Sequence, residues 1–434
     1  MIAFLLYLTF TVSYFLHMAA RSPVLGVIHI DFILMGATLF AMIAEGRRGE
    51  MTWKDFRAAR VLFLLILYVF LTVPLVQWPG SVIKYGIPDY AKVVFFFIFT
   101  LGIINTEKRV KIFVTVFLLC QIFRILEPLY MHVASGYWGD KAYSMVGGSL
   151  SKLNRLSGAP RDTVNANQFA WVIVTTLPFL YYLGLQRGRL LKLLVIGLSP
   201  FLLYALMLTG SRSGLLSLGA VIIAIILLGE NRMKRLTIAA VLVLPLAFFA
   251  KSHLSHSLDT RYDSIINHNV AGGDTAEGRI RGLEQDLSTI WSRPIFGHGL
   301  GTSYETNAND LAGRAQITHD MYIEILQELG VVGFIIFIIY IKSIISSLKE
   351  AKKIANSLQD DKWLLNLITA IQVWIAMDLF YSISCFGLMS WEWYLFGGLS
   401  AACLRLASER ESVCAEGECA ENAYSQMAVS LVHE

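Results

Sequence analysis

The sequence is a succession of long apolar stretches that hold few charged residues and are separated by polar connections. Crossing the hydrocarbon core of a bilayer takes about 20 mostly apolar residues in a helix. Matching the stretches to that length predicts about twelve membrane-spanning helices. They lie at residues 2–20, 25–45, 61–78, 90–105, 111–127, 169–185, 193–209, 214–229, 236–250, 322–345, 364–382 and 388–405.

The composition agrees with a membrane protein. Hydrophobic residues make up 56% of the chain and charged residues only 16%, whereas a soluble chain is about half apolar and about a quarter charged. We therefore expect an all-α, polytopic membrane protein that contacts the lipid bilayer. The first stretch has no basic start and no small-residue cleavage site, so we interpret it as a span rather than a cleaved signal. A net charge of +4 without a solvated basic domain argues against a nucleic-acid partner.

Lysine and arginine gather in every second connection. Cytoplasmic loops of membrane proteins are enriched in these residues. The connection after the second predicted span is therefore placed inside, and the alternation then holds at every later turn. The basic residues of that first inner connection are Arg47, Arg48, Lys54, Arg57 and Arg60. This pattern predicts an inner-membrane protein with both termini cytoplasmic and its working face on the far, periplasmic or extracellular, side.

Two predicted outer connections are much longer than the rest, and loops of such length are usually functional. They are residues 128–168 and 251–320. The predicted order is N-terminal transmembrane helices (1–127), first periplasmic loop (128–168), central transmembrane helices (169–250), large periplasmic loop (251–320), C-terminal transmembrane helices (321–405) and a disordered cytoplasmic tail (406–434).

The larger loop contains one segment with helical spacing, because Ile280, Leu283, Leu287 and Ile290 share one face. Such a helix could lie on the membrane surface, with its arginines near the depth of the lipid headgroups. The glycine-rich stretch that follows does not come after a strand. We therefore favour a tight loop over a phosphate cradle.

His319 lies where the larger loop meets the predicted span at 322–345. The helix dipole there disfavours an imidazolium ion, so the side chain should stay neutral and able to accept a proton. A free helix N-terminus also favours an anion such as a phosphate group. The alternative is an interfacial histidine without a chemical role.

Arg212 stands in a tight outer turn between two apolar helices. Ionisable groups at membrane depth are rare and usually functional, which favours anion binding. The alternative is an arginine that extends to the lipid headgroups. The end of the first loop, Asn165–Gln168, either presents polar groups at the outer mouth or caps the next helix. Arg124 and Glu127 are expected to pair with each other.

Metal and hydrolase motifs are missing from the outer loops. These loops hold no Asp-x-Asp, no histidine or cysteine cluster with metal spacing, and no Gly-x-Ser-x-Gly elbow. Several arginines and one histidine at a helix start therefore favour metal-free chemistry on a phosphate-bearing substrate. Arginine suits a diphosphate because its planar fork binds two oxygens at once.

Four motifs occur in an order that resembles the O-antigen ligase and polymerase superfamily. They are Arg-Leu-Ser-Gly with Asn-Ala-Asn-Gln-Phe-Ala (155–170), Thr-Gly-Ser-Arg-Ser-Gly (209–214), Glu-Gly-Arg with Trp-Ser-Arg-Pro-Ile-Phe-Gly-His-Gly-Leu-Gly (277–301) and Thr-His-Asp-Met-Tyr-Ile-Glu with Glu-Leu-Gly-Val-Val-Gly (318–333). The family's histidine is most often followed by asparagine, where this chain has Asp320. The resemblance covers roughly residues 155–345.

This resemblance implies a membrane glycosyltransferase that takes a saccharide from undecaprenyl diphosphate and transfers it to a glycolipid or glycan acceptor. His319 would match the general base of the family, and Arg212 and Arg279 its diphosphate-binding arginines. Arg281 and Arg161 are weaker candidates for the same role. We expect no cofactor and no metal ion. Transfer to lipid A-core, which defines an O-antigen ligase, is the activity we favour; the alternatives are a polysaccharide polymerase, a protein O-glycan ligase and a transporter.

Overall fold

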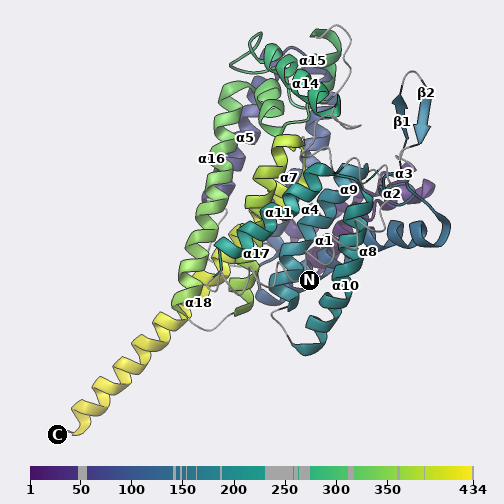
Figure 1. Ribbon diagram of the computed structural model, residues 1–434. Helices are drawn as coiled ribbons and strands as arrows, with labels where there is room; N and C mark the ends of the chain where they lie inside the picture. The colour runs from purple at the N-terminus through teal and green to yellow at the C-terminus, as the bar shows by residue number, and fades with distance from the viewer. Residues whose placement is uncertain are drawn as a thin grey trace.

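The computed structural model describes residues 1–46, 56–139, 143–146, 149–152, 154–162, 164–185, 188–229, 258, 262, 274–310, 317–358, 362–385 and 387–432. These residues form a bundle of helices, from which a two-stranded hairpin projects (Figure 1). The helices and strands are α1 (Ile2–Phe15), α2 (Met18–Arg21), α3 (Pro23–Val27), α4 (Ile30–Ala44), α5 (Arg57–Thr72), α6 (Pro79–Ser81), α7 (Ile87–Ile103), α8 (Glu107–Ser135), β1 (Tyr143–Val146), β2 (Ser149–Lys152), α9 (Ala166–Phe179), α10 (Arg189–Leu208), α11 (Arg212–Leu227), α14 (Asp274–Ile290), α15 (Ser303–Asp310), α16 (Met321–Ser357), α17 (Lys362–Tyr381) and α18 (Trp391–Val432).

Within the described residues, seven helical segments are long and apolar enough to cross a membrane. They are Arg57–Leu75, Pro79–Ile103, Glu107–Ser135, Ala166–Leu185, Arg189–Leu208, Met321–Ser357 and Lys362–Ser384. Three shorter apolar helices, α1, α4 and α11, coincide with further predicted spans. The chain is thus a helical, multi-pass membrane protein. The expected number of about twelve spans is not confirmed, and the predicted span at 236–250 lies outside the described residues.

The buried core lies where the first half of α18 packs against α7 and α16. Aromatic side chains dominate this core, and Trp374, Trp393 and Tyr340 are among the largest fully buried ones. The rings of Trp374 and Trp393 lie 5.3 Å apart, in an edge-to-face arrangement. This packing brings residues from distant parts of the chain to the same end of the bundle.

The bundle is all-helical, as expected, but the first long loop adds a hairpin that was not predicted. Strands β1 and β2 pair antiparallel, with Tyr143 opposite Lys152 and Val146 opposite Ser149. Strands of four residues are too short to show a clear alternation of apolar and polar residues. Helix α8 also extends to Ser135 and so enters the segment predicted as loop.

The tail expected to be disordered from about residue 406 continues instead as part of α18 to Val432. Leu406 and Ala407 are still buried against the bundle, whereas Glu411 and Ser412 are exposed. Alanine and glutamate are frequent in this stretch and favour helix without tertiary contacts. Helix propensity therefore explains the continued helix.

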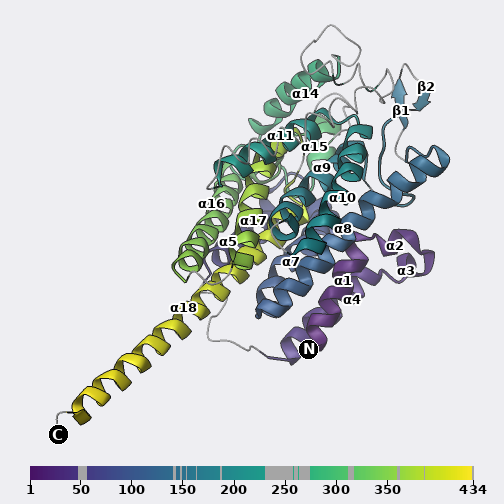
Figure 2. The same ribbon diagram turned by 60° about the horizontal axis from the view of Figure 1, so that its bottom comes forward.

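The connections predicted to be inside lie together at one end of the bundle. The amino group of Met1 lies 2.7 Å from Glu45 Oε1, and Arg405 donates to the carbonyl of Leu101 over 3.1 Å. Arg410 pairs with Glu107. Figure 2 shows both termini towards this end, with α14, α15 and the hairpin towards the other. The described parts of these connections agree with the charge pattern, whereas the connection at 230–235 lies outside the described residues. The side of the membrane that each end faces stays a prediction.

Thiol labelling tests that orientation. In a cysteine-free background, Asn309→Cys on exposed α15 should react with a membrane-impermeant reagent in intact cells. Glu350→Cys, on the exposed final part of α16, should react only after the membrane is opened. The opposite pattern would invert the topology and contradict the proposed working face.

Candidate functional site

A cavity of about 360 Å³ lies at the predicted outer end of the bundle. Its walls come from the end of α1, the middle of α8, the starts of α9, α16 and α18, and the end of α17. Its size is within the range of about 300–1,000 Å³ that is usual for ligand pockets. Four buried carboxylates face it, from Glu324, Glu328, Asp378 and Glu392.

Glu324 and Glu328 lie one turn apart on α16, a spacing that places both on one helix face. Glu328 accepts hydrogen bonds from the backbone amides of Gly301 (2.7 Å) and Ser303 (3.2 Å), one on each oxygen. Glu324 uses its Oε2 alone, which accepts from the amides of Gly387 (2.7 Å) and Leu388 (3.2 Å). Both carboxylates thus hold loops against α16.

The glycine-rich stretch packs directly on a break in α16. The amides of His298 and Gly299 donate to the carbonyls of Gln327 and Glu328, each over 2.9 Å. The break is at Gly330, whose φ of +65° is in the left-handed region. A Cβ there would also come within 2.2 Å of the Ile295 carbonyl oxygen, so only glycine fits. The tight-loop interpretation of the glycines agrees with this packing.

His298 is fully buried and bound on both sides of its ring. Its Nδ1 contacts the side-chain oxygen of Gln77, and its Nε2 lies 3.1 Å from the carbonyl of Thr289. These contacts join α14 and the chain before α6 to the glycine-rich loop. The contacts of His298 therefore indicate a structural role, in which it holds the glycine-rich loop in place.

The first two motifs also form one packed unit. The amide of Leu156 donates to the carbonyl of Leu208 over 2.8 Å, and Arg155 Nε donates to the carbonyl of Thr209 over 2.7 Å. Arg155 Nη2 also donates to Asn167 Oδ1 over 2.6 Å. The sequence-based predictions did not single out Arg155 as a site residue. Its place at the start of the Arg-Leu-Ser-Gly motif is the feature that could have identified it.

Asn165 caps α9. Its side-chain oxygen accepts from the backbone amides of Asn167 (2.9 Å) and Gln168 (3.0 Å). In turn, the backbone amide of Asn165 donates to Gln168 Oε1 over 3.0 Å. This is a capping box, the arrangement favoured at helix starts. The alternative of a helix cap is confirmed, and Gln168 additionally lines the cavity.

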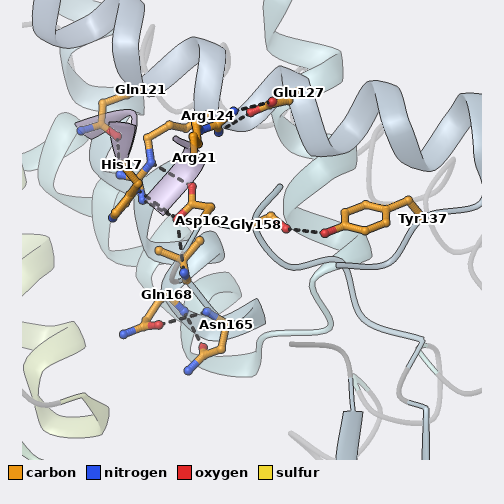
Figure 3. A network of polar contacts seen from close by, with 11 residues as sticks. His17, Arg21, Gln121, Arg124, Glu127, Tyr137, Gly158, Asp162, Asn165 and Gln168 are labelled. Atoms are coloured by element: carbon orange, nitrogen blue, oxygen red, sulfur yellow. Dashed lines mark hydrogen bonds and ion pairs between the residues drawn. The ribbon is translucent and has the colours of Figure 1, made fainter. Parts of the chain in front are cut away.

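Arg124 and Asp162 form a buried two-pronged ion pair beside the cavity (Figure 3). Arg124 Nε and Nη2 donate to the two Asp162 oxygens over 3.2 and 3.3 Å. Removing one partner of such a pair typically costs about 3–5 kcal/mol, since a buried charge remains. The expected pairing of Arg124 with Glu127 is wrong, because Glu127 accepts from Arg21 over 2.6 and 2.7 Å.

His17 adds a second nitrogen to this network, with Nδ1 3.4 Å from Asp162 Oδ1. Burial by itself would raise the pKa of Asp162. The charges of Arg124 and His17, with the hydrogen bonds to the carboxylate, outweigh burial and hold that pKa below its ordinary value. Asp162 is thus held as a carboxylate that fixes Arg124 in the cavity wall.

His319 is exposed one residue before the cap of α16. Its Nδ1 lies 2.7 Å from the carbonyl of Ile317, a residue that lines the cavity. Since a carbonyl only accepts, Nδ1 carries the hydrogen and Nε2 is the acceptor of the neutral ring. His319 therefore lies close to the rim of the cavity.

The helix start beside His319 is not open to a phosphate group, contrary to the sequence-based expectation. Asp320 Oδ1 accepts from the amides of Tyr322 (2.9 Å) and Ile323 (3.0 Å) and so occupies the anion position. Burial raises the pKa of Asp320 above its ordinary value, although these two bonds act in the opposite direction.

Two of the four candidate arginines, Arg212 and Arg161, are not among the described residues that line the cavity. Arg212 is the first residue of α11, where Ser211 caps the amide of Gly214 over 3.2 Å. Arg161 is exposed, has a φ of +66° and donates to the Arg21 carbonyl over 2.7 Å. Arg279 and Arg281 lie in the first half of α14, of which the structure describes the backbone only.

Helix α14 confirms the helical spacing predicted near residue 280. Leu283 and Leu287 are exposed, while Asp286, Thr289 and Ile290 are buried towards α16. The predicted apolar face is therefore divided, with Leu283 and Leu287 turned outwards and Ile290 buried, and its contact with a membrane surface stays a prediction. Among the described residues, no group of three or more histidine, cysteine or acidic side chains could hold a metal ion.

The bundle and the cavity at its end define a multi-pass membrane protein with an internal site. Residues 173–338 match the family model described as O-antigen ligase. This match confirms the resemblance to the O-antigen ligase and polymerase superfamily, whose members are glycosyltransferase-like enzymes. The matched region contains Arg212, Arg279, Arg281 and His319. A comparison with curated proteins gives no match.

Proposed function

We propose that this chain is a periplasm-facing glycosyltransferase that moves a saccharide from undecaprenyl diphosphate to an acceptor hydroxyl. The acceptor we favour is lipid A-core, the acceptor of an O-antigen ligase. The match of residues 173–338 to the O-antigen ligase family carries this proposal. Residues of three of the four motifs line one cavity, and the second motif packs against the first, which supports it.

In the proposed reaction, the acceptor oxygen forms a bond to the anomeric carbon of the donor sugar. The bond between that carbon and the diphosphate oxygen breaks, and the diphosphate leaves with its charge. His319 takes the proton of the acceptor hydroxyl as general base. Arg212 and Arg279 hold the leaving diphosphate and stabilise its growing charge, with Arg281 and Arg161 as weaker candidates.

The lipid-linked saccharides of a deletion strain separate the candidate activities. If the chain is a ligase, its loss should leave long polymers attached to the lipid carrier. If it is a polymerase, single repeat units should accumulate instead. Unchanged lipid-linked saccharides would contradict both activities and favour transport.

Purified protein in detergent tests the expectation that no metal ion takes part. Transfer from the lipid-linked donor should continue at the same rate in excess chelator, because arginines supply the positive charge. A rate that falls with chelator and returns with a divalent cation would contradict the metal-free mechanism. The control is donor and acceptor incubated without protein.

A further inference from the structure

Each of two carboxylates in the cavity accepts hydrogen bonds from the protein through only one of its two oxygens. Asp378 Oδ1 accepts from Trp171 Nε1 over 2.9 Å, and Glu324 Oε2 accepts from the amides of Gly387 and Leu388. The second oxygen of each has no hydrogen-bond partner among the described residues. Neither atom is sealed inside packed side chains, so both open onto the cavity that these residues line.

Both side chains are almost completely buried, with exposed fractions of 3% for Glu324 and 5% for Asp378. A buried carboxylate oxygen without a hydrogen bond is costly, so its environment calls for a donor. A carboxylate accepts hydrogen bonds from hydroxyl groups. The cavity therefore offers two acceptors to a molecule that carries hydroxyls.

The cavity walls also provide flat apolar surfaces. Trp171 and Trp391 both line it, and their rings lie 5.8 Å apart at a steep angle. Aromatic rings present a large, rigid apolar face to a ligand. A sugar ring has one apolar face of C–H groups and a rim of hydroxyls. Carboxylates beside tryptophans match both features.

The acidic lining of the cavity makes a diphosphate a poor candidate for its occupant. Four carboxylates line it, and the guanidinium of Arg124 is already paired with Asp162. A diphosphate is held by cationic side chains or amide donors rather than by acidic side chains, so this lining argues against it. A metal cation is disfavoured as well, since no described group of three acidic, histidine or cysteine side chains could hold one.

We propose that this cavity binds a saccharide part of the substrate, with sugar hydroxyls donating to Asp378 and Glu324 and a sugar ring packed on the tryptophans. This inference rests on the proposed function and divides the site into two parts. The uncharged sugar occupies the carboxylate cavity, and the diphosphate stays outside it. The saccharide can come from the donor or from the acceptor, and the experiment below distinguishes the two.

Two isosteric variants test the proposal. In Asp378→Asn the amide oxygen can keep the bond from Trp171, and in Glu324→Gln it can keep the two backbone bonds. The amide NH₂ group then faces the cavity, which turns an acceptor into a donor while the fold contact remains. The probe is the mixture of oligosaccharides released by mild acid from the surface polysaccharide of the strain that carries this chain.

Each variant should bind these oligosaccharides roughly ten- to a hundredfold more weakly than the wild type, the loss expected for a hydrogen bond to a charged group. Asp89→Asn is the matched control, because Asp89 is exposed and pairs with Lys92 over 2.8 Å. It should bind like the wild type. Unchanged binding by both cavity variants would overturn the proposal.

Glu328→Gln is the control for a carboxylate whose role is purely structural. Both Glu328 oxygens accept backbone amides, so its amide NH₂ group must face an N–H donor. This variant should lose thermal stability in detergent, whereas Asp378→Asn and Glu324→Gln should melt near the wild-type temperature. The wild type supplies a readout that needs no variant, since bound oligosaccharide should shield Trp171, the partly exposed tryptophan of the cavity, from quenching by acrylamide. Absence of shielding would also overturn the proposal.

Transfer kinetics identify the source of the saccharide. A raised KM for the lipid-linked donor, with the acceptor KM unchanged, assigns the cavity to the donor sugar, and the reverse assigns it to the acceptor. Oligosaccharide binding without any transfer would leave the cavity assignment standing and contradict the proposed function. If sodium or potassium ions change the acrylamide quenching and oligosaccharides do not, the saccharide assignment of the cavity is contradicted and a cation site is indicated.

Discussion

Replacing His319 by alanine should reduce glycan transfer by about 10²–10⁴-fold, the usual contribution of a general base. The side chain is exposed near the rim of the cavity, and its Nδ1–H is directed to the Ile317 carbonyl. Its Nε2 is therefore the atom expected to take the proton from the hydroxyl group of the acceptor substrate. The measurement is transfer by purified protein from a lipid-linked saccharide, with surface glycan as the cellular readout.

Two other histidines provide controls. His29 is exposed with a φ of +51°, so His29→Asn, which tolerates that backbone, should leave transfer unchanged. His298→Ala should lower thermal stability, since it removes the buried contacts to Gln77 and Thr289. A His319→Ala protein that folds normally and keeps most of the wild-type rate would contradict the base assignment.

Replacing Arg212 should cost on the order of 2–4 kcal/mol of transition-state stabilisation, if this arginine holds the diphosphate. Arg212→Lys keeps the charge but loses the two-pronged fork, so it should remain strongly impaired. Arg279→Ala should show a similar loss. The measurement is kcat/KM for the lipid-linked donor with purified protein at matched detergent concentration.

Arg189 is the matched control for Arg212, because each is the first residue of an apolar helix. Arg189 is exposed at the predicted inner end, so Arg189→Ala should keep wild-type transfer. Near-wild-type transfer by both Arg212→Ala and Arg279→Ala, at normal protein levels, would contradict the diphosphate assignment.

Local sequence patterns determined the parts of this protein that depend on neighbours in the chain. The long apolar stretches predicted α5, α7, α8, α9 and α10, since length and composition set membrane helices. The spacing of Ile280, Leu283, Leu287 and Ile290 predicted α14. The Asn165–Gln168 segment predicted the cap of α9, because the capping box is formed by residues three apart.

The tertiary structure decided which distant side chains meet. Arg124 lies three residues from Glu127 but pairs with Asp162, 38 residues away, because a loop folds back onto α8. Glu324 and Asp378 look like isolated acids in apolar helices, and only the packing of α16 and α17 places both at one cavity. The relative rotation of packed helices depends on all their contacts at once, so no local period of the sequence encodes it.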